Sequence, residues 1–100
     1  MSSLDAPTRC VIADDERLMR EQLRARLLEV WPELQIVAEA RNGSEAVALV
    51  AEHKPELVFL DIRMPGLTGV EAARQIAQME VEDDELLPQI VFITAYDQYA

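Results

Sequence analysis

The sequence has few of the features that mark a secreted, membrane-spanning or nucleic-acid-binding chain. Its single cysteine, Cys10, cannot form an internal disulfide, which fits a reducing cytoplasm. No apolar run approaches the roughly 20 residues of a membrane helix, and no basic segment followed by an apolar stretch opens the chain as a secretory signal would. Lys and Arg number 9 against 19 Asp and Glu, a formal net charge of −10. We therefore expect a cytoplasmic chain that itself binds neither DNA nor an anionic membrane.

Apolar residues make up half of the 100 residues and fall in blocks, which predicts one small folded domain. Short apolar runs alternate with segments whose apolar residues recur at helical spacing. Strands are expected at residues 10–13, 35–40, 57–61 and 89–95, and helices at residues 16–31, 44–53 and 70–79. Ser44 is expected to cap the second helix. This alternation predicts an α/β fold, with right-handed crossovers and a mostly parallel sheet.

The first predicted helix has an apolar stripe and a basic face. The helix is predicted because Met19, Leu23, Leu27 and Val30 recur at helical spacing, with Leu18, Ala25 and Leu28 alongside. The basic face consists of Arg17, Arg20, Arg24 and Arg26. Such a face is either ordinary solvated surface or a docking surface for a partner, and the sequence leaves both interpretations open.

Polar side chains follow the carboxyl ends of three predicted strands. Asp14 and Asp15 end the first strand, Asp61 the third and Thr94 the fourth. In an open parallel sheet, ligands bind beyond these ends, where the strand order reverses. If the order is 2-1-3-4, the first and third strands are neighbours at that point. We then expect the three carboxylates to share one pocket.

Three neighbouring carboxylates repel one another strongly. One pair at ~4 Å costs roughly 4 kcal/mol at an effective dielectric of about 20. A divalent cation relieves this repulsion, and carboxylate oxygens without Cys or nearby His favour Mg²⁺ or Mn²⁺ over Zn²⁺. Magnesium leaves room for a phosphate ligand, which indicates phosphoryl chemistry. The alternative is that these acids are ordinary strand-end residues, with Asp14 or Asp15 capping the first helix.

Asp61 is the best candidate for an acceptor, because carboxylates can form aspartyl-phosphates and an irregular loop follows it. That loop can turn the main-chain carbonyl of Arg63 toward a metal. Gly66 and Gly69 allow close backbone approach or unusual dihedral angles. The hydroxyl of Thr94 can bond a phosphoryl oxygen.

Three stretches, VIADDERLMREQL, VFLDIRMPGLTG and VFITAYDQYA, together resemble the receiver domain of two-component response regulators. The resemblance covers residues from about 9 to 100. The tail TAYDQYA further resembles receivers of the LytTR type, which carry a separate DNA-binding output domain. The resemblance implies a flavodoxin-like, doubly wound parallel sheet of order 2-1-3-4, lacking the usual fifth strand and last helix. Residues 1–100 would then be a C-terminally truncated receiver domain whose output domain is absent.

By this resemblance, Asp61 is the phosphoacceptor that takes a phosphoryl group from a histidine kinase. Asp15 would ligate Mg²⁺ directly, Asp14 at least through water, and Arg63 through its main-chain carbonyl. Thr94 matches the switch hydroxyl. The chain would not be an enzyme beyond slow intrinsic autophosphorylation and dephosphorylation. The parent protein would control an output, namely DNA binding and transcription, and the basic helix would dock the kinase.

The chain departs from the family at its end. Receivers use a lysine at the end of a fifth strand and a preceding switch aromatic, and this sequence ends at Ala100, before both. Lys54 precedes the third predicted strand and cannot substitute. Without a fifth strand, residues 89–95 would form an apolar edge, and such edges recruit other strands. We therefore expect a homodimer through the fourth strand and the C-terminal tail.

Three other functions can be compared with the sequence. One is a non-phosphorylated interaction or dimerisation module of the same fold. Another is a haloacid-dehalogenase-type phosphatase, whose signature needs a second aspartate where this chain has Arg63. A nucleotide-binding Rossmann domain is excluded, because no glycine-rich turn follows the first strand.

Overall fold

The computed structural model describes residues 7–79 and 87–93. In this part of the chain the strands are β1 (Arg9–Ala13), β2 (Gln35–Ala40), β3 (Leu57–Asp61) and β4 (Gln89–Ile93), and the helices are α2 (Arg17–Val30), α3 (Gly43–His53) and α4 (Gly69–Ala77). The strands form one sheet of order β2-β1-β3-β4, and every pairing is parallel. The predicted α/β fold with a doubly wound sheet of order 2-1-3-4 is confirmed. No helix among the described residues is both long and apolar enough to cross a membrane.

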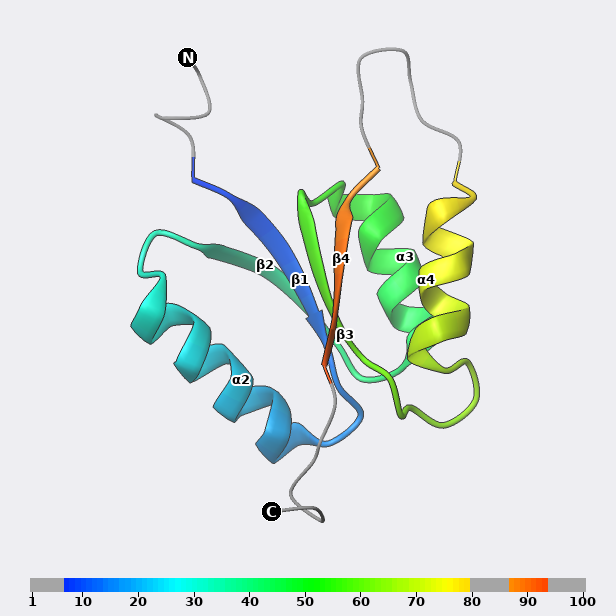
Figure 1. Ribbon diagram of the computed structural model, residues 1–100, viewed down its shortest axis with the longest axis horizontal. Helices are drawn as coiled ribbons and strands as arrows, with labels where there is room; N and C mark the ends of the chain where they lie inside the picture. Colours follow the sequence, from blue (N-terminus) through cyan, green and yellow to red (C-terminus); the bar gives the residue numbers. More distant parts are fainter. Residues whose placement is uncertain (1–6, 80–86, 94–100) are drawn as a thin grey trace.

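The helices cover the sheet on both faces. Helix α2 lies on one face, and α3 and α4 lie side by side on the other (Figure 1). The chain moves outward from β1 to β2 and then returns past β1 to β3. Because each crossover is right-handed, this reversal of direction places α3 and α4 on the face opposite α2. The carboxyl ends of β1 and β3 therefore meet where the strand order reverses.

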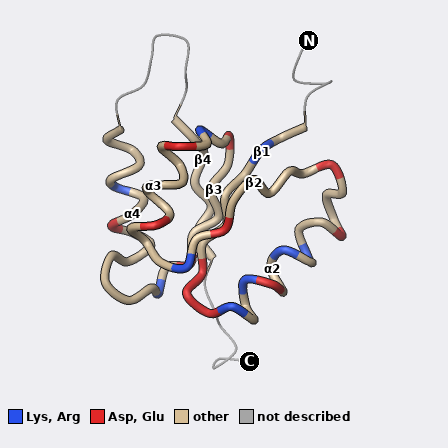
Figure 2. Tube along the Cα trace, turned by 180° about the vertical axis from the view of Figure 1, so that it is seen from behind, with Lys and Arg blue, Asp and Glu red and all other residues tan. Residues whose placement is uncertain are grey.

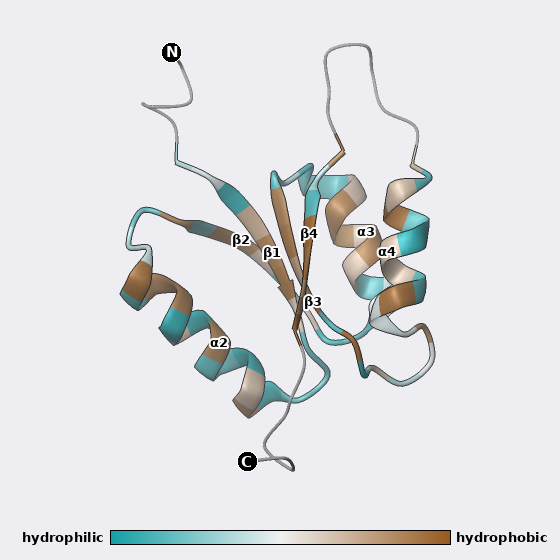
Figure 3. Ribbon diagram, in the orientation of Figure 1, coloured by the Kyte–Doolittle hydropathy of each residue, from teal (hydrophilic) through white to brown (hydrophobic). Residues whose placement is uncertain are grey.

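The central strands β1 and β3 build two separate apolar clusters. Successive strand residues face opposite sides, so Cys10, Ile12 and Phe59 pack beneath α2, whereas Val58 and Leu60 pack against the other two helices. The central strands are accordingly coloured as hydrophobic along much of their length (Figure 3). Each fully buried side chain of this size contributes about 1.5–3 kcal/mol to folding. This core fixes the strand ends on which the polar residues lie.

Helix α2 packs lightly against the sheet. Leu23 and Leu27 lie against the cluster beneath the helix, together with Trp31. Val30 is 78% exposed and Met19 is 41% exposed, although both share the helical spacing of Leu23 and Leu27. No residue of α2 is fully buried. The cluster beneath α2 is therefore contacted by Leu23, Leu27 and Trp31, while Met19 and Val30 stay exposed.

The residue that caps α3 is not the one that the sequence predicts. Asn42 caps the helix, and its side chain accepts a hydrogen bond of 2.8 Å from the amide of Glu45. The prediction that Ser44 is the cap is wrong, because Ser44 already lies inside the helix. Both residue types cap helices well, and the extended backbone of Asn42 (φ −160°, ψ 173°) decides between them.

Candidate functional site

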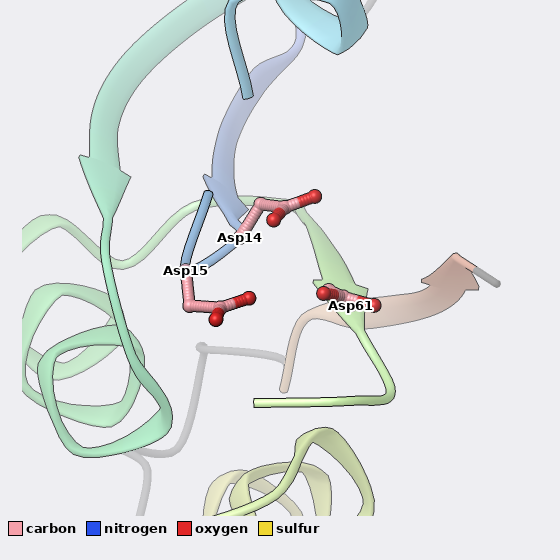
Figure 4. A group of neighbouring side chains, drawn as sticks. All are labelled: Asp14, Asp15 and Asp61. Carbon is pink, nitrogen blue, oxygen red and sulfur yellow. The ribbon is translucent and has the colours of Figure 1, made fainter. Parts of the chain in front are cut away.

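The register of the sheet brings three aspartates together. Ala13 of β1 pairs with Leu60 of β3, so Asp14 and Asp61, the next residues of each strand, reach the same edge side by side. Asp15 follows directly. One carboxylate oxygen from each of the three lies within 4.8 Å of the others, and the side chains surround a common space (Figure 4). The predicted convergence of these residues is confirmed.

Asp14 is buried, and hydrogen bonds fix its amide, its carbonyl and its carboxylate. Its side chain and backbone are only 7% exposed. Its amide donates to the carbonyl oxygen of Ala40 at the end of β2 (3.1 Å), and its carboxylate Oδ1 accepts from the amide of Glu16 (2.9 Å). Its carbonyl oxygen accepts from Nη1 of Arg20 (2.7 Å). The carboxylate thus orders the turn before α2 but does not cap the helix, because the N-cap residue is Glu16 and no side chain makes a cap hydrogen bond. The alternative that Asp14 or Asp15 caps the first helix is therefore wrong.

Asp61 ends β3 and begins an irregular loop. The amide of Arg63 donates to Oδ1 of Asp61 (3.2 Å). The next residue, Ile62, is hydrogen-bonded to two other elements. Its amide donates to the carbonyl of Ile93 in β4, and its carbonyl accepts from the amide of Gly69 at the start of α4 (3.1 Å each). The backbone around Asp61 is therefore fixed to a strand and to the start of a helix.

Two residues of the loop after Asp61 anchor it to the core. Met64 is 4% exposed and belongs to the cluster beneath α3 and α4, and Leu67 packs against the same cluster. Between them, Gly66 adopts a positive φ of 74°, which disfavours a side chain. The loop thus turns sharply at its tip while both flanks stay in contact with the protein.

Gly69 permits the closest backbone approach near the site. A Cβ atom on this residue would lie 2.2 Å from the carbonyl oxygen of Asp61 and 2.8 Å from the Cα of Ile62. These are backbone atoms and cannot rotate away. The first turn of α4, whose cap is Thr68 in a capping box with Glu71, is therefore seated directly against the end of β3. The predicted uses of Gly66 and Gly69 are both confirmed.

The local electrostatics disfavour three bare negative charges. Burial raises the pKa of Asp14, and the nearby Asp15 adds to this rise, while the hydrogen bond from Glu16 and the charge of Arg20 oppose it. Burial also raises the pKa of Asp61, with further rises from Asp14 and Asp15. The amide of Arg63 acts in the opposite direction. A cation among the three carboxylates would remove this cost.

The donor set fits Mg²⁺. It consists of hard carboxylate oxygens on Asp14, Asp15 and Asp61, which suit Mg²⁺ better than Zn²⁺. Cys10 stands near the opposite, amino end of β1 and is fully buried. The direction of the Arg63 carbonyl stays a prediction, since its observed bond uses the amide. Thr94 lies outside the described residues.

Sequence reasoning missed one residue of this region. Arg20 was assigned to a basic helix face, yet its side chain is 11% exposed and contacts both Asp14 and Glu39. The available signal was its place in the first turn after the acidic pair, together with an acidic residue near the end of the second strand.

A doubly wound parallel sheet with an acidic cluster at its switch point defines a class of signalling domain. Residues 10–100 match the response regulator receiver domain family, and the chain belongs to that family. The predicted resemblance to two-component receivers is thereby confirmed.

Several known proteins are similar to this chain. An uncharacterised response regulatory protein of Vibrio cholerae is 50% identical over 90 residues, which are 90% of this chain and 33% of that protein. The transcriptional regulatory protein BtsR of Salmonella typhi is 42% identical over 90 residues, or 90% of this chain and 35% of BtsR. The chain thus spans about a third of the length of these relatives. The crystal structure of a LuxR-family two-component response regulator from Aurantimonas sp. SI85-9A1 superimposes with a TM-score of 0.76 at 35% identity, covering 91% of this chain and 61% of that one.

Proposed function

We propose that the chain is a phosphoacceptor receiver and that Asp61 takes a phosphoryl group from a phosphohistidine of a histidine kinase. The observation that carries this proposal is the meeting of Asp14, Asp15 and Asp61 within 4.8 Å at the switch point of the sheet. A carboxylate oxygen of Asp61 forms the new bond to phosphorus while the phosphorus–nitrogen bond breaks. The departing histidine nitrogen keeps the electron pair and takes up a proton.

The three aspartates would hold Mg²⁺ in this proposal. Asp15 is exposed and suits a direct ligand, whereas Asp14 is buried and already accepts a hydrogen bond through Oδ1, which suits a contact through water. The carbonyl of Arg63 is proposed as a further ligand. When bound, the ion would neutralise the carboxylates and the incoming phosphate.

Thr94 is proposed as the switch hydroxyl that bonds the phosphoryl group. Support comes from its neighbour in the sequence, because Ile93 pairs with Asp61 in the β3–β4 ladder.

The biological role follows from the family. We propose that residues 1–100 are the receiver part of a longer response regulator, which works in the cytoplasm and controls transcription through a separate output domain that binds DNA. Similarity to BtsR, a transcriptional regulatory protein, supports this output. The receiver would not turn over a substrate as an enzyme does, since the group it accepts ends on its own side chain and leaves only by slow hydrolysis.

Phosphorylation in vitro tests this function directly. The protein is incubated with Mg²⁺ and acetyl phosphate, and its intact mass is measured. The wild type is expected to gain one phosphoryl group, Asp61→Asn none, and the exposed control Glu52→Gln as much as the wild type. A gain that persists in Asp61→Asn would refute the assignment. If a longer chain with the fifth-strand lysine is labelled and this one is not, the requirement lies in that lysine. If neither is labelled, the proposed function fails.

A second proposal concerns homodimerisation through β4. This strand lies at the edge of the described sheet, and two of its residues, Val91 and Phe92, are 41% and 44% exposed. Exposed apolar edge strands pair readily with other chains. Sedimentation velocity is expected to show a concentration-dependent dimer that Phe92→Lys disrupts. A monomer at all concentrations would contradict the proposal and leave the phosphoacceptor function untouched.

A further inference from the structure

Arg20 joins three parts of the fold at the acidic site. It lies in the first turns of α2, and its Nη1 donates to the carbonyl oxygen of Asp14 at 2.7 Å. Its Nε donates to Oε1 of Glu39 in β2 at 3.2 Å. We propose that Arg20 is a positioning residue, which holds the turn after β1 so that Asp14 and Asp15 present their carboxylates to the metal. This inference rests on the proposed function.

The geometry shows how one side chain can set the direction of two carboxylates. The Asp14 carbonyl belongs to the same planar peptide as the amide of Asp15, so fixing that oxygen fixes the plane from which Asp15 starts. The amide of Asp14 is fixed independently by the carbonyl of Ala40. Ala40 follows Glu39 directly. The bond from the Asp14 amide and the bond through Arg20 therefore both connect Asp14 to the end of β2.

The bond also requires arginine in particular. The guanidinium uses Nε for Glu39 and Nη1 for Asp14, two donors that point in different directions from one rigid plane. A lysine ammonium at the end of a flexible stem lacks this fixed fork. The positive charge also opposes the repulsion within the site, since it acts to lower the pKa of Asp14.

Burial separates Arg20 from the other arginines of α2. The Arg20 side chain is 11% exposed, whereas those of Arg17 and Arg24 are 76% and 48% exposed. Arg17 pairs with Glu21 along the helix, and acidic and basic segments both occur along α2 (Figure 2). Arg20 is thus poorly placed to dock a partner. Arg24 also pairs with Glu39 (3.5 Å) but has no hydrogen bond to Asp14 among the described contacts, which makes it a matched control.

The experiment compares Arg20→Gln with Arg24→Gln. Each variant loses one positive charge and one contact to Glu39, and only the first loses the bond to the Asp14 carbonyl. We expect Arg20→Gln to bind Mg²⁺ about tenfold more weakly by calorimetry, as is typical when a partner that orients a metal ligand is removed. Amide hydrogen exchange at Asp14 and Glu16, measured without metal, is expected to quicken. Arg24→Gln should match the wild type in both, and Arg20→Lys should not restore affinity.

Several outcomes would overturn the inference. One is an Arg20→Gln protein that is folded by circular dichroism and binds Mg²⁺ as the wild type does. Another is an equal loss of Mg²⁺ affinity in Arg24→Gln, because the effect would then come from the lost positive charge alone. If Arg20→Gln does not fold, Glu39→Ala serves instead, since it removes the side-chain oxygens that accept from Nε of Arg20 and keeps the positive charge of Arg20. It is expected to weaken Mg²⁺ binding in the same direction, and unchanged binding would refute the role.

The phosphoacceptor function and the positioning role of Arg20 can be refuted independently of each other. Wild-type protein that binds Mg²⁺ but gains no phosphoryl group on Asp61 would sink the phosphoacceptor function and leave the positioning role of Arg20 intact. If the wild type binds no Mg²⁺, hydrogen exchange decides alone. Unchanged exchange at Asp14 in Arg20→Gln would then refute the positioning role, and faster exchange would support it.

Discussion

Replacing Gly69 with alanine tests whether the contact between α4 and the end of β3 positions the acceptor. The new Cβ would lie 2.2 Å from the carbonyl oxygen of Asp61, and real Cβ contacts are essentially never shorter than 3.0 Å. The helix and the strand must therefore separate by at least 0.8 Å. The atoms in conflict belong to the backbone, so no side-chain rotation can absorb the shift.

Two opposing effects set the size of the change in stability. Alanine is favoured over glycine in helices by about 1 kcal/mol in the interior and by less at the first helical position, where Gly69 lies. Overpacking of a rigid contact costs about 1–3 kcal/mol. We expect overpacking to win by about 1–2 kcal/mol. For a domain of this size that lowers the Tm by roughly 5–15 °C.

The functional effect should exceed the effect on stability. A displacement of about 1 Å at a reacting group can slow a reaction about 100-fold, and the moving carbonyl belongs to Asp61 itself. The rate of phosphorylation by acetyl phosphate is measured by intact mass at a temperature where circular dichroism shows both proteins folded. We expect Gly69→Ala to be slower by one to two orders of magnitude.

Gly66→Ala is the matched control for this prediction. Gly66 has a positive φ of 74°, but a Cβ there would meet nothing within 4 Å. The substitution should cost roughly 1–2 kcal/mol of backbone strain without crowding Asp61. If Gly69→Ala is phosphorylated as fast as Gly66→Ala when both are folded, the close contact does not position the acceptor.

Three more predictions concern stability and reactivity. Burial and neighbouring charges raise the pKa of Asp61 above its ordinary 3.8, so its ionised form destabilises the fold. Asp61→Asn should raise the Tm at pH 7 without divalent cations and lose this gain below pH 3.8, and an unchanged Tm would contradict the reasoning. Cys10 is fully buried with a pKa of about 11; a thiol reagent at pH 8 should therefore react at the rate of unfolding, and rapid labelling of native protein would refute this. Thr68→Ala should cost about 1 kcal/mol in urea denaturation through loss of the α4 cap, with Thr68→Ser close to wild type.

Short-range patterns were sufficient to predict the parallel strands. The acidic cluster also needed the strand order 2-1-3-4, which the resemblance to receivers implied. Strands covered on both faces read as continuous apolar runs, and an aspartate after such a run marks a strand end. The carboxyl ends of parallel strands share one edge, so Asp14, Asp15 and Asp61 could be brought together without coordinates.

Other features depend on contacts that a pattern does not contain. The role of Arg20 requires knowing that its side chain reaches Glu39 of β2, which lies 19 positions away in the sequence. Val30 fits the helical period, yet its side chain is exposed, whereas the next residue, Trp31, packs against the cluster beneath α2. The contact between Gly69 and Asp61 likewise arises only when the start of α4 is placed against the end of β3.

The light packing of α2 has an evolutionary consequence. None of its residues is fully buried, and substitutions at exposed positions usually change stability by less than about 0.5 kcal/mol. Its outward residues, Leu18 among them, can therefore diverge between paralogues at little thermodynamic cost, while β1 and β3 tolerate almost no change. Substitutions that alter the outward surface of α2 and substitutions that would disturb the acidic site therefore fall on different elements of one small domain.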